Sequence, residues 1–190
     1  MAADFAAARW NMVDSQVRPN DVTDVRIQDA MREIAREGFA PAGKAYLAYA
    51  DTEVEYAPGR WLLKPRDVAK LLQAVRPQGG ERALAIAAPY AAAVLESVGL
   101  SVERTDSESL APPTGATFDV IVCEGAVAEC PKAWLAALAP GGRLGVVERD
   151  GPVGKATLYV RAEDGVGRRP VFDATPPVLA GFEAQRGFAF

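Results

Sequence analysis

The chain has 190 residues, 49% hydrophobic and 24% charged, so it can bury one core and is expected to form a single domain over 1–190. Its net charge is −4 at pH 7, and it lacks the clustered Lys and Arg that bind nucleic acid or anionic membrane. Neither partner is therefore expected. The chain contains no histidine, which excludes Ser-His-Asp catalysis, Cys-His catalysis and histidine-ligated metal.

The two cysteines, Cys123 and Cys130, are too few for a disulfide framework or a four-ligand zinc site, and we interpret them as buried thiols. The start of the chain, MAADFAAARW, lacks the basic region and long apolar core of a signal peptide. No window approaches the roughly 18 apolar residues of a membrane span. These observations predict a cytoplasmic protein without a metal site.

Residues 1–80 are expected to be helical and irregular. Apolar residues at three- and four-residue spacing predict helices up to Pro19, from Thr23 as N-cap to Gly38, and from Pro65 to Val75. Prolines and glycines make Phe39 to Leu62 irregular, with extended pieces at Tyr46–Tyr49 and Val54–Tyr56.

Residues 81–150 alternate between strand and helix, which predicts parallel strands joined by right-handed crossovers. The expected strands are Ala83–Ala87, Leu100–Arg104, Phe118–Cys123 and Arg143–Glu148, with helices from Tyr90 to Gly99 and from Pro131 to Leu138. In residues 151–190, the turn signal Asp164-Gly165 separates Ala156–Arg161 from Arg168–Ala174 and predicts an antiparallel hairpin at the sheet edge.

A set of short matches runs in one order along nearly the whole chain. In the N-terminal half they are Arg9-x-x-Met12-Val13-x-x-Gln16, Val22-Thr23-Asp24, Arg36-Glu37-x-Phe39-x-Pro41, Ala45-Tyr46, and Gly59-Arg60 before Pro65. In the C-terminal half they are Phe118-Asp119-Val120-Ile121-Val122, Pro131, Leu135, Leu138, Gly141-Gly142-Arg143-Leu144, and the ending Gly181-Phe182-Glu183 to Phe188-Ala189-Phe190. Together they resemble the protein-L-isoaspartate O-methyltransferase family.

The resemblance implies an α/β, Rossmann-like methyltransferase sheet with an N-terminal helical segment packed on it. It implies S-adenosylmethionine as cofactor, isoaspartyl-containing proteins as partners, and a protein-repair activity that methylates isoaspartyl carboxylates. In the family, the first strand ends in an acid and leads into a loop of the type Gly-x-Gly-x-Gly. Aligning on Ile86 and Tyr90 places Ala85 at the acid position and leaves only Ala87, Ala88 and Pro89 for the five-residue loop.

Of two other functional positions of the family, one has lost its polar side chain and the other keeps an acid. Leu63 stands where family members carry a Ser or Thr that helps to place the isoaspartyl carboxyl, and leucine offers no hydrogen bond. Ser101-Val102-Glu103-Arg104 resembles the second strand, whose acid binds the ribose hydroxyls, so Glu103 is the best candidate for a ligand contact; a solvated glutamate is the alternative. After Ala111, the short run Pro112 to Thr117 leaves no room for the family's next strand, which predicts a sheet lacking one edge strand.

The remaining chemical groups are given structural interpretations. Glu124 and Glu129, around the turn after a strand, are interpreted as surface carboxylates because no partner is apparent. The three tryptophans, Trp10, Trp61 and Trp134, are assigned to core packing.

Three functions therefore stay open. The first is a working isoaspartyl methyltransferase, since methyl transfer needs mainly alignment of a carboxylate with the sulfonium methyl. The second is a catalytically inactive relative that binds or regulates an unknown protein partner through the retained fold. The third is a different small-molecule site in the remaining crevice. The altered loop, acid and Ser/Thr position predict weak or no methyl transfer.

Overall fold

The computed structural model describes residues 4–184, so the sequence match at Phe188-Ala189-Phe190 lies outside the described residues. The helices are α1 (Phe5–Met12), α2 (Val25–Glu33), α3 (Pro65–Val75), α4 (Pro89–Ser97) and α5 (Lys132–Ala136). The strands are β1 (Val54–Ala57), β2 (Arg60–Leu62), β3 (Arg82–Ile86), β4 (Ser101–Thr105), β5 (Phe118–Val127), β6 (Leu138–Glu148), β7 (Gly154–Ala162) and β8 (Gly165–Ala174).

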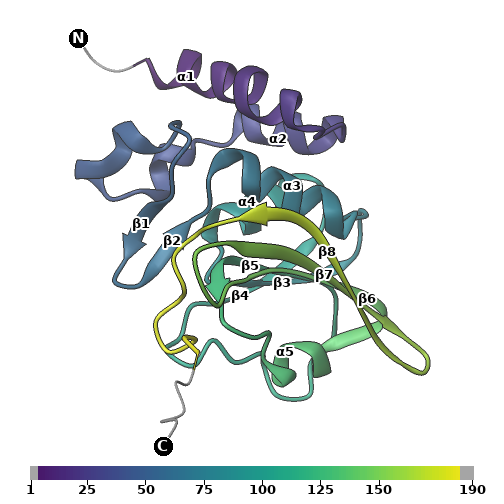
Figure 1. Ribbon diagram of the computed structural model, residues 1–190. Helices are drawn as coiled ribbons and strands as arrows, with labels where there is room; N and C mark the ends of the chain where they lie inside the picture. The colour runs from purple at the N-terminus through teal and green to yellow at the C-terminus, as the bar shows by residue number, and fades with distance from the viewer. Residues whose placement is uncertain (1–3, 185–190) are drawn as a thin grey trace, which may run out of the picture.

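A six-stranded sheet in the order β4-β3-β5-β6-β7-β8 organises the chain. The pairs among β4, β3, β5 and β6 are parallel, whereas β7 and β8 add antiparallel strands at one edge. This is the predicted α/β sheet with its C-terminal hairpin, and β4 forms the opposite edge, where the family's additional strand was predicted to be missing. Helices α3 and α4 cover one face with α1 and α2 stacked beyond them, while the short α5 lies on the other face (Figure 1).

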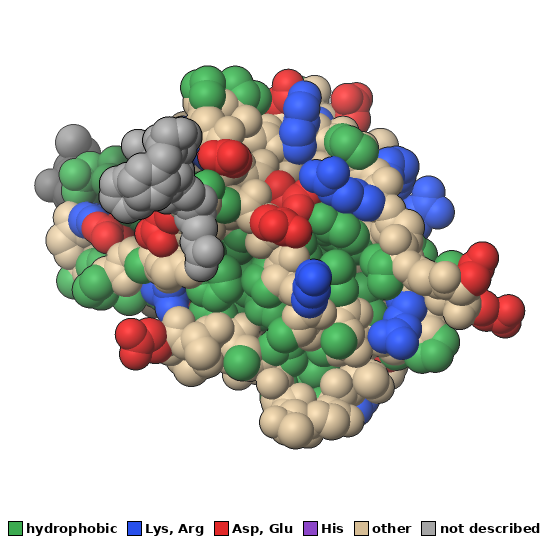
Figure 2. Space-filling view, turned by 60° about the horizontal axis from the view of Figure 1, so that its bottom comes forward, with side chains coloured by type: hydrophobic (Ala, Val, Ile, Leu, Met, Phe, Trp, Pro, Cys, Tyr) green, Lys and Arg blue, Asp and Glu red, His purple; other side chains and the backbone are tan. Residues whose placement is uncertain are grey.

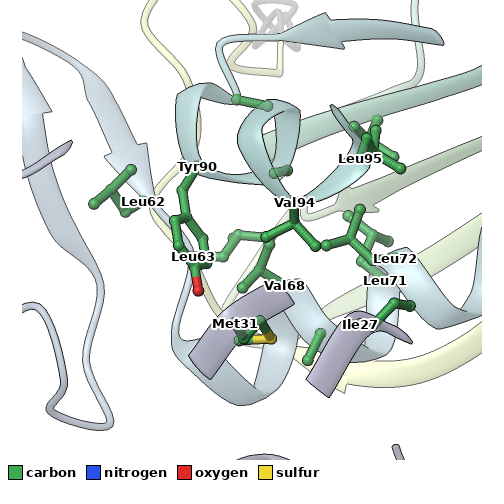
Figure 3. Packing of buried hydrophobic residues seen from close by; sticks show 14 of the residues in the cluster. Ile27, Met31, Leu62, Leu63, Val68, Leu71, Leu72, Tyr90, Val94 and Leu95 are labelled. Atoms are coloured by element: carbon green, nitrogen blue, oxygen red, sulfur yellow. The ribbon is translucent and has the colours of Figure 1, made fainter. Parts of the chain in front are cut away.

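Two apolar clusters fill the two sides of the sheet. The larger one joins the N-terminal helices to α3, α4 and the sheet, and Figure 3 shows Ile27, Met31, Val68, Leu72 and Val94 converging there. The smaller one lies on the α5 side around the buried Trp134. Figure 2 looks toward this second side and shows hydrophobic side chains grouped near the centre, with charged side chains around them.

The C-terminal end of α3 is tied to the sheet by one arginine. Arg76 takes the left-handed conformation with φ +48°, which ends the helix. Arg143 of β6 donates to the carbonyl oxygens of Val75 at 3.0 Å and Arg76 at 2.8 Å, and also forms an ion pair with Glu81 at 2.8 Å. These contacts satisfy carbonyl groups that a helix end leaves without partners.

Several sequence predictions in the N-terminal part were wrong in detail. The N-cap of α2 is Asp24, whose carboxylate accepts from Arg26, and the helix ends at Glu33 because Ile34 is extended with ψ 124°. Arg9 donates to the carbonyl of Glu33 at 2.9 Å and so stabilises that end. The segment Tyr46–Tyr49 is not extended, since the chain forms a 3₁₀ turn over Ala42–Leu47.

Three strand boundaries also differ from the predictions. β5 continues past Cys123 to Val127, and β6 begins at Leu138 rather than Arg143, so the helix predicted up to Leu138 is only α5. β2 pairs with β1 as a small separate sheet within the region predicted to be irregular up to Leu62. In each case the strand end is set by pairing with a neighbouring strand, and the residues at that end do not by themselves indicate such pairing.

No helix among residues 4–184 has the length and apolar character that crossing a membrane requires. Both cysteines are buried free thiols, as predicted. Burial raises the pKa of Cys123 well above its ordinary value, so this thiol stays protonated and unreactive.

Candidate cofactor and ligand site

The turn from β3 into α4 is short and filled by side chains. Ala85 at the end of the strand is 1% exposed, and Ala87 and Ala88 in the turn are 1% and 3% exposed. Ala87 holds φ +45°, a left-handed conformation that glycine adopts without strain, and its N–H donates to the carbonyl of Thr105 at 2.9 Å. Pro89 is the first residue of α4 and supplies no N–H. The turn therefore keeps a positive φ of the kind that glycine favours, but the methyl groups of Ala87 and Ala88 lie beside its backbone.

A carboxylate from the neighbouring strand occupies the N-terminus of α4. Glu124 of β5 is fully buried, and its Oε1 accepts from the N–H of Ala91 at 2.7 Å. Its Oε2 accepts from the N–H of Leu63 at 3.0 Å. Burial raises the pKa of Glu124, while the nearby Arg36 and the bonds from the Ala91, Leu63 and Tyr90 N–H groups oppose that rise. A helix N-terminus favours a negative charge, so the carboxylate caps α4 from outside the helix.

The counter-charge comes from Arg36, which is also fully buried. Its Nε donates to the carbonyl of Ala48 at 2.8 Å, and its Nη2 donates to the carbonyl of Leu63. Leu63 therefore bridges the two charges, because its carbonyl accepts from Arg36 and its N–H donates to Glu124. Desolvation lowers the pKa of Arg36 from its ordinary value.

Tyr90 completes this buried cluster. The guanidinium of Arg36 lies 4.5 Å from the centre of the Tyr90 ring, and Phe39 packs against the ring edge at 5.6 Å. Figure 3 shows the ring extending from α4 past Leu63 toward Met31 of α2. Within residues 4–184, the Tyr90 hydroxyl and Arg36 Nη1 are buried without a hydrogen-bond partner. Burial raises the pKa of Tyr90 above its ordinary value.

The predicted ligand residues do not all meet at this cluster. Leu63 and Tyr90 lie in it, while Ala85 of β3, Ala87 and Ala88 of the turn, and Pro89 at the start of α4 adjoin it. Glu103 lies opposite Leu84 on the edge strand β4, two residues before its end. Its side chain is 45% exposed and forms an ion pair with Arg82 at 2.7 Å.

Asp106, rather than Glu103, is the first acid beyond the end of β4. Arg60 Nε donates to it at 3.2 Å, and the Tyr56 hydroxyl lies 3.2 Å from its Oδ2. Arg60 and Asp106 line a pocket of about 430 Å³ between the β1–β2 turn and Ala180–Gly181. The described residues contain no group of three or more His, Cys, Asp or Glu side chains placed to hold a metal ion.

Two interpretations of single residues were wrong. Glu124 is not a surface carboxylate, because β5 extends past it and brings it under α4; Glu129 is exposed as predicted. Trp134 packs in the core and Trp61 is half-buried, but Trp10 is 56% exposed and Arg32 lies 5.0 Å from its ring centre. Arg36 stands in the family motif Arg36-Glu37-x-Phe39-x-Pro41, and no local feature of the sequence indicates that it is buried.

Sequence comparison with curated proteins decides the family. A protein-L-isoaspartate O-methyltransferase of Methylorubrum populi is 32% identical over 209 positions, which cover 94% of this chain and 98% of the relative. The chain belongs to the protein-L-isoaspartate O-methyltransferase family. A family member of Rhodopseudomonas palustris strain HaA2 is 33% identical over 171 positions, covering 75% of this chain and 70% of the relative. No family model matches the sequence.

Solved structures show the same fold. A protein-L-isoaspartate O-methyltransferase aligns over 91% of this chain and 66% of its own, with TM-score 0.71 and 19% identity. A second protein of this kind, from Plasmodium falciparum and solved with S-adenosyl-L-homocysteine, aligns over 90% of this chain and 97% of its own, with TM-score 0.70 and 16% identity. The predicted Rossmann-like methyltransferase fold is thus confirmed.

The residues of this chain do not fit the family's cofactor. Ala87 and Ala88 place buried β-carbons in the turn where a ligand would need bare backbone, and Pro89 offers no donor. The N–H of Ala91, a donor that the start of α4 could otherwise offer, is already bonded to Glu124.

Proposed function

We propose that this family member has weak or no methyl transfer and that its retained fold serves as a binding or regulatory protein. The observation that carries this proposal is the bond from the Ala91 N–H to the buried carboxylate of Glu124, which fills the N-terminus of α4 from within the chain. The proposal places the protein in the cytoplasm, where it would meet other proteins.

The magnitude of the expected loss supports this proposal. A hydrogen bond contributes about 1 kcal/mol, and each 1.4 kcal/mol changes an affinity about tenfold. The turn lacks the glycines and the acid of the family loop, which Ala85, Ala87 and Ala88 replace, and Pro89 offers no N–H. Losing three or four such contacts would weaken cofactor binding by roughly two to three orders of magnitude.

The alignment with the Methylorubrum populi relative points in the same direction. Because 94% of 190 residues is about 179, about 30 of the 209 aligned positions fall in gaps of this chain. The sheet ends at β4, and only Asp106 to Thr117 connect that strand to β5. We infer that some of these gaps fall between the two strands, where the family is expected to carry a further strand and the loop on the adenine side of the cofactor.

Calorimetric titration with S-adenosylmethionine and S-adenosylhomocysteine tests the proposal, followed by a methyl-transfer assay on an isoaspartyl peptide. The Methylorubrum populi relative, prepared in parallel, is the positive control. We expect no binding heat at micromolar cofactor and little or no turnover. Micromolar affinity together with turnover would overturn the proposal.

A working methyltransferase is the second candidate, and it is favoured by the names of the relatives at 32% and 33% identity. The two candidates differ in their dependence on cofactor. If partner recognition is retained without catalysis, an isoaspartyl peptide should bind more tightly than its aspartyl counterpart in the absence of cofactor. Equal binding of the two peptides would instead direct the search to a different protein partner.

A further inference from the structure

Among the described residues, the carboxylate of Glu124 lies in a buried site that is separate from the exposed clefts. Its donors are the N–H groups of Ala91 and Leu63, which contact the two oxygens of Glu124 at 2.7 and 3.0 Å. The helix that presents Ala91 has nine residues, long enough to favour an anion at its N-terminus.

Two further groups face the same buried cluster. Arg36 supplies the positive charge, and its Nη1 has no hydrogen-bond partner among the described residues. The Tyr90 hydroxyl is likewise buried without a partner there. Since buried polar atoms in proteins are nearly always paired, the cluster has more hydrogen-bonding capacity than Glu124 alone uses.

We propose that the N-terminus of α4 is a carboxylate-binding site which the chain fills with its own Glu124, as a tethered ligand in place of a free one. The ligand class is a small aliphatic carboxylate. The donors at Ala91 and Leu63 recognise its two oxygens, and Arg36, which donates to the Leu63 carbonyl, supplies a positive charge nearby. The proposal explains why a glutamate stands within the buried, apolar run of β5.

The atoms removed from the Glu124 side chain decide which small carboxylate should fill the space. Glu124→Ala removes four heavy atoms, Cγ, Cδ and the two oxygens, which is the heavy-atom set of acetate. Glu124→Gly removes one carbon more, which is the set of propionate. If the site binds carboxylates, acetate should restore the alanine variant best, and propionate should restore the glycine variant best.

Thermal unfolding measures this restoration. Both variants should unfold at lower temperature than the wild type, because the buried N–H groups of Ala91 and Leu63 lose their acceptor and the buried Arg36 loses a nearby negative charge. The matched carboxylate should raise the variant's midpoint saturably by about 3 °C or more, with little effect on the wild type. The proteins are refolded from urea with the probe present, since the site is closed to solvent.

Three controls separate specific binding from general effects. Acetamide has the shape of acetate without its charge and should not restore Glu124→Ala, and neither should chloride. Glu129→Ala removes an exposed carboxylate and should show no acetate response. In ¹H–¹⁵N spectra, acetate should return the Ala91 and Leu63 amide resonances of Glu124→Ala toward their wild-type positions.

Several outcomes would overturn the proposal. These are equal stabilisation of wild type and variant by acetate, restoration by acetamide, or Ala91 and Leu63 resonances that do not respond. If neither truncated variant folds, Glu124→Gln decides, because it keeps the shape and removes the charge. A midpoint equal to that of the wild type at pH 7 would show that these donors do not require a carboxylate.

This inference deepens the proposed function, since it names what occupies the site in place of the cofactor. Its test uses no cofactor and no methyl acceptor, so the two can fail separately. Acetate could fail to restore Glu124→Ala in a protein that still binds no S-adenosylmethionine.

Discussion

Arg36 lies over the ring of Tyr90, with its guanidinium carbon 4.5 Å from the ring centre and both side chains fully buried. Arg36 belongs to the N-terminal segment and Tyr90 to the first helix of the α/β core, so the contact joins the two parts of the chain. The same arginine is connected through Leu63 to Glu124 of β5. One cluster therefore fixes three distant segments of the sequence against one another.

Arg36→Met is expected to lower the free energy of unfolding by about 3–5 kcal/mol. The change removes the bonds that Arg36 donates to the carbonyls of Ala48 and Leu63, and it removes the positive charge that opposes the rise in the pKa of the buried Glu124. Urea unfolding measures the difference. The double variant Arg36→Met/Glu124→Gln should be less destabilised than the sum of the two single changes. Additive effects would show that the two groups are not coupled.

Gly125→Ala is expected to destabilise the protein by about 2–4 kcal/mol. Gly125 has φ +123°, and a β-carbon there would lie 2.6 Å from Cδ2 of the buried Leu179. The positive φ strains an alanine at this position, and the overlap requires the buried Leu179 side chain to shift away from β5. Gly43→Ala is the matched control, because no atom lies within 4 Å of the added carbon. Equal urea midpoints for the two variants would contradict this packing.

Glu81 is expected to make the protein less stable as pH falls below about 4.5. Burial tends to raise the pKa of Glu81, but its hydrogen bonds from Arg143 and from the Gln78 N–H outweigh burial and lower it. A carboxyl with a lowered folded-state pKa stabilises the fold above its unfolded-state pKa, 4.5, and loses that contribution as pH falls through the folded value.

Urea unfolding of wild type and Glu81→Gln between about pH 6 and pH 3 measures this contribution. The glutamine variant should be less stable at pH 6, and the difference between the two proteins should shrink toward pH 3. A constant difference over that range would mean that Glu81 does not titrate differently in the folded state.

The sequence predicted the elements that are encoded locally and missed contacts that only the fold creates. Pro65 as the first residue of α3 and the Asp164-Gly165 turn between β7 and β8 are local signals, and both predictions were right. Arg36 and Glu124 are 88 positions apart, and nothing near Arg36 in the sequence indicates that it becomes buried close to Glu124. A glutamate within the apolar run Phe118–Val127 was the available signal, but the strand was predicted to end at Cys123.

Two features oppose cofactor binding, the side chains of the β3–α4 turn and the Glu124 carboxylate at the N-terminus of α4, and Ala87→Gly tests the first without changing the second. Glycine relieves the strain of the left-handed conformation at φ +45°, which stabilises the fold by about 1–2 kcal/mol. It also removes a buried methyl group and makes the unfolded chain more flexible, and these two effects destabilise the fold by a similar amount. The free energy of unfolding should therefore change by less than about 1 kcal/mol. Ala85→Gly, in the extended strand β3, has no strain to relieve and should cost about 1–2 kcal/mol.

Ala87→Gly should still not bind S-adenosylmethionine in a calorimetric titration, because the N–H of Ala91 remains bonded to Glu124. The backbone bend at position 87 is already present, so a glycine there changes strain without opening space at the helix N-terminus. Micromolar binding by this single variant would show that the loop residue, and not Glu124, keeps the cofactor out. Binding only after Glu124 is also truncated would assign that role to the carboxylate.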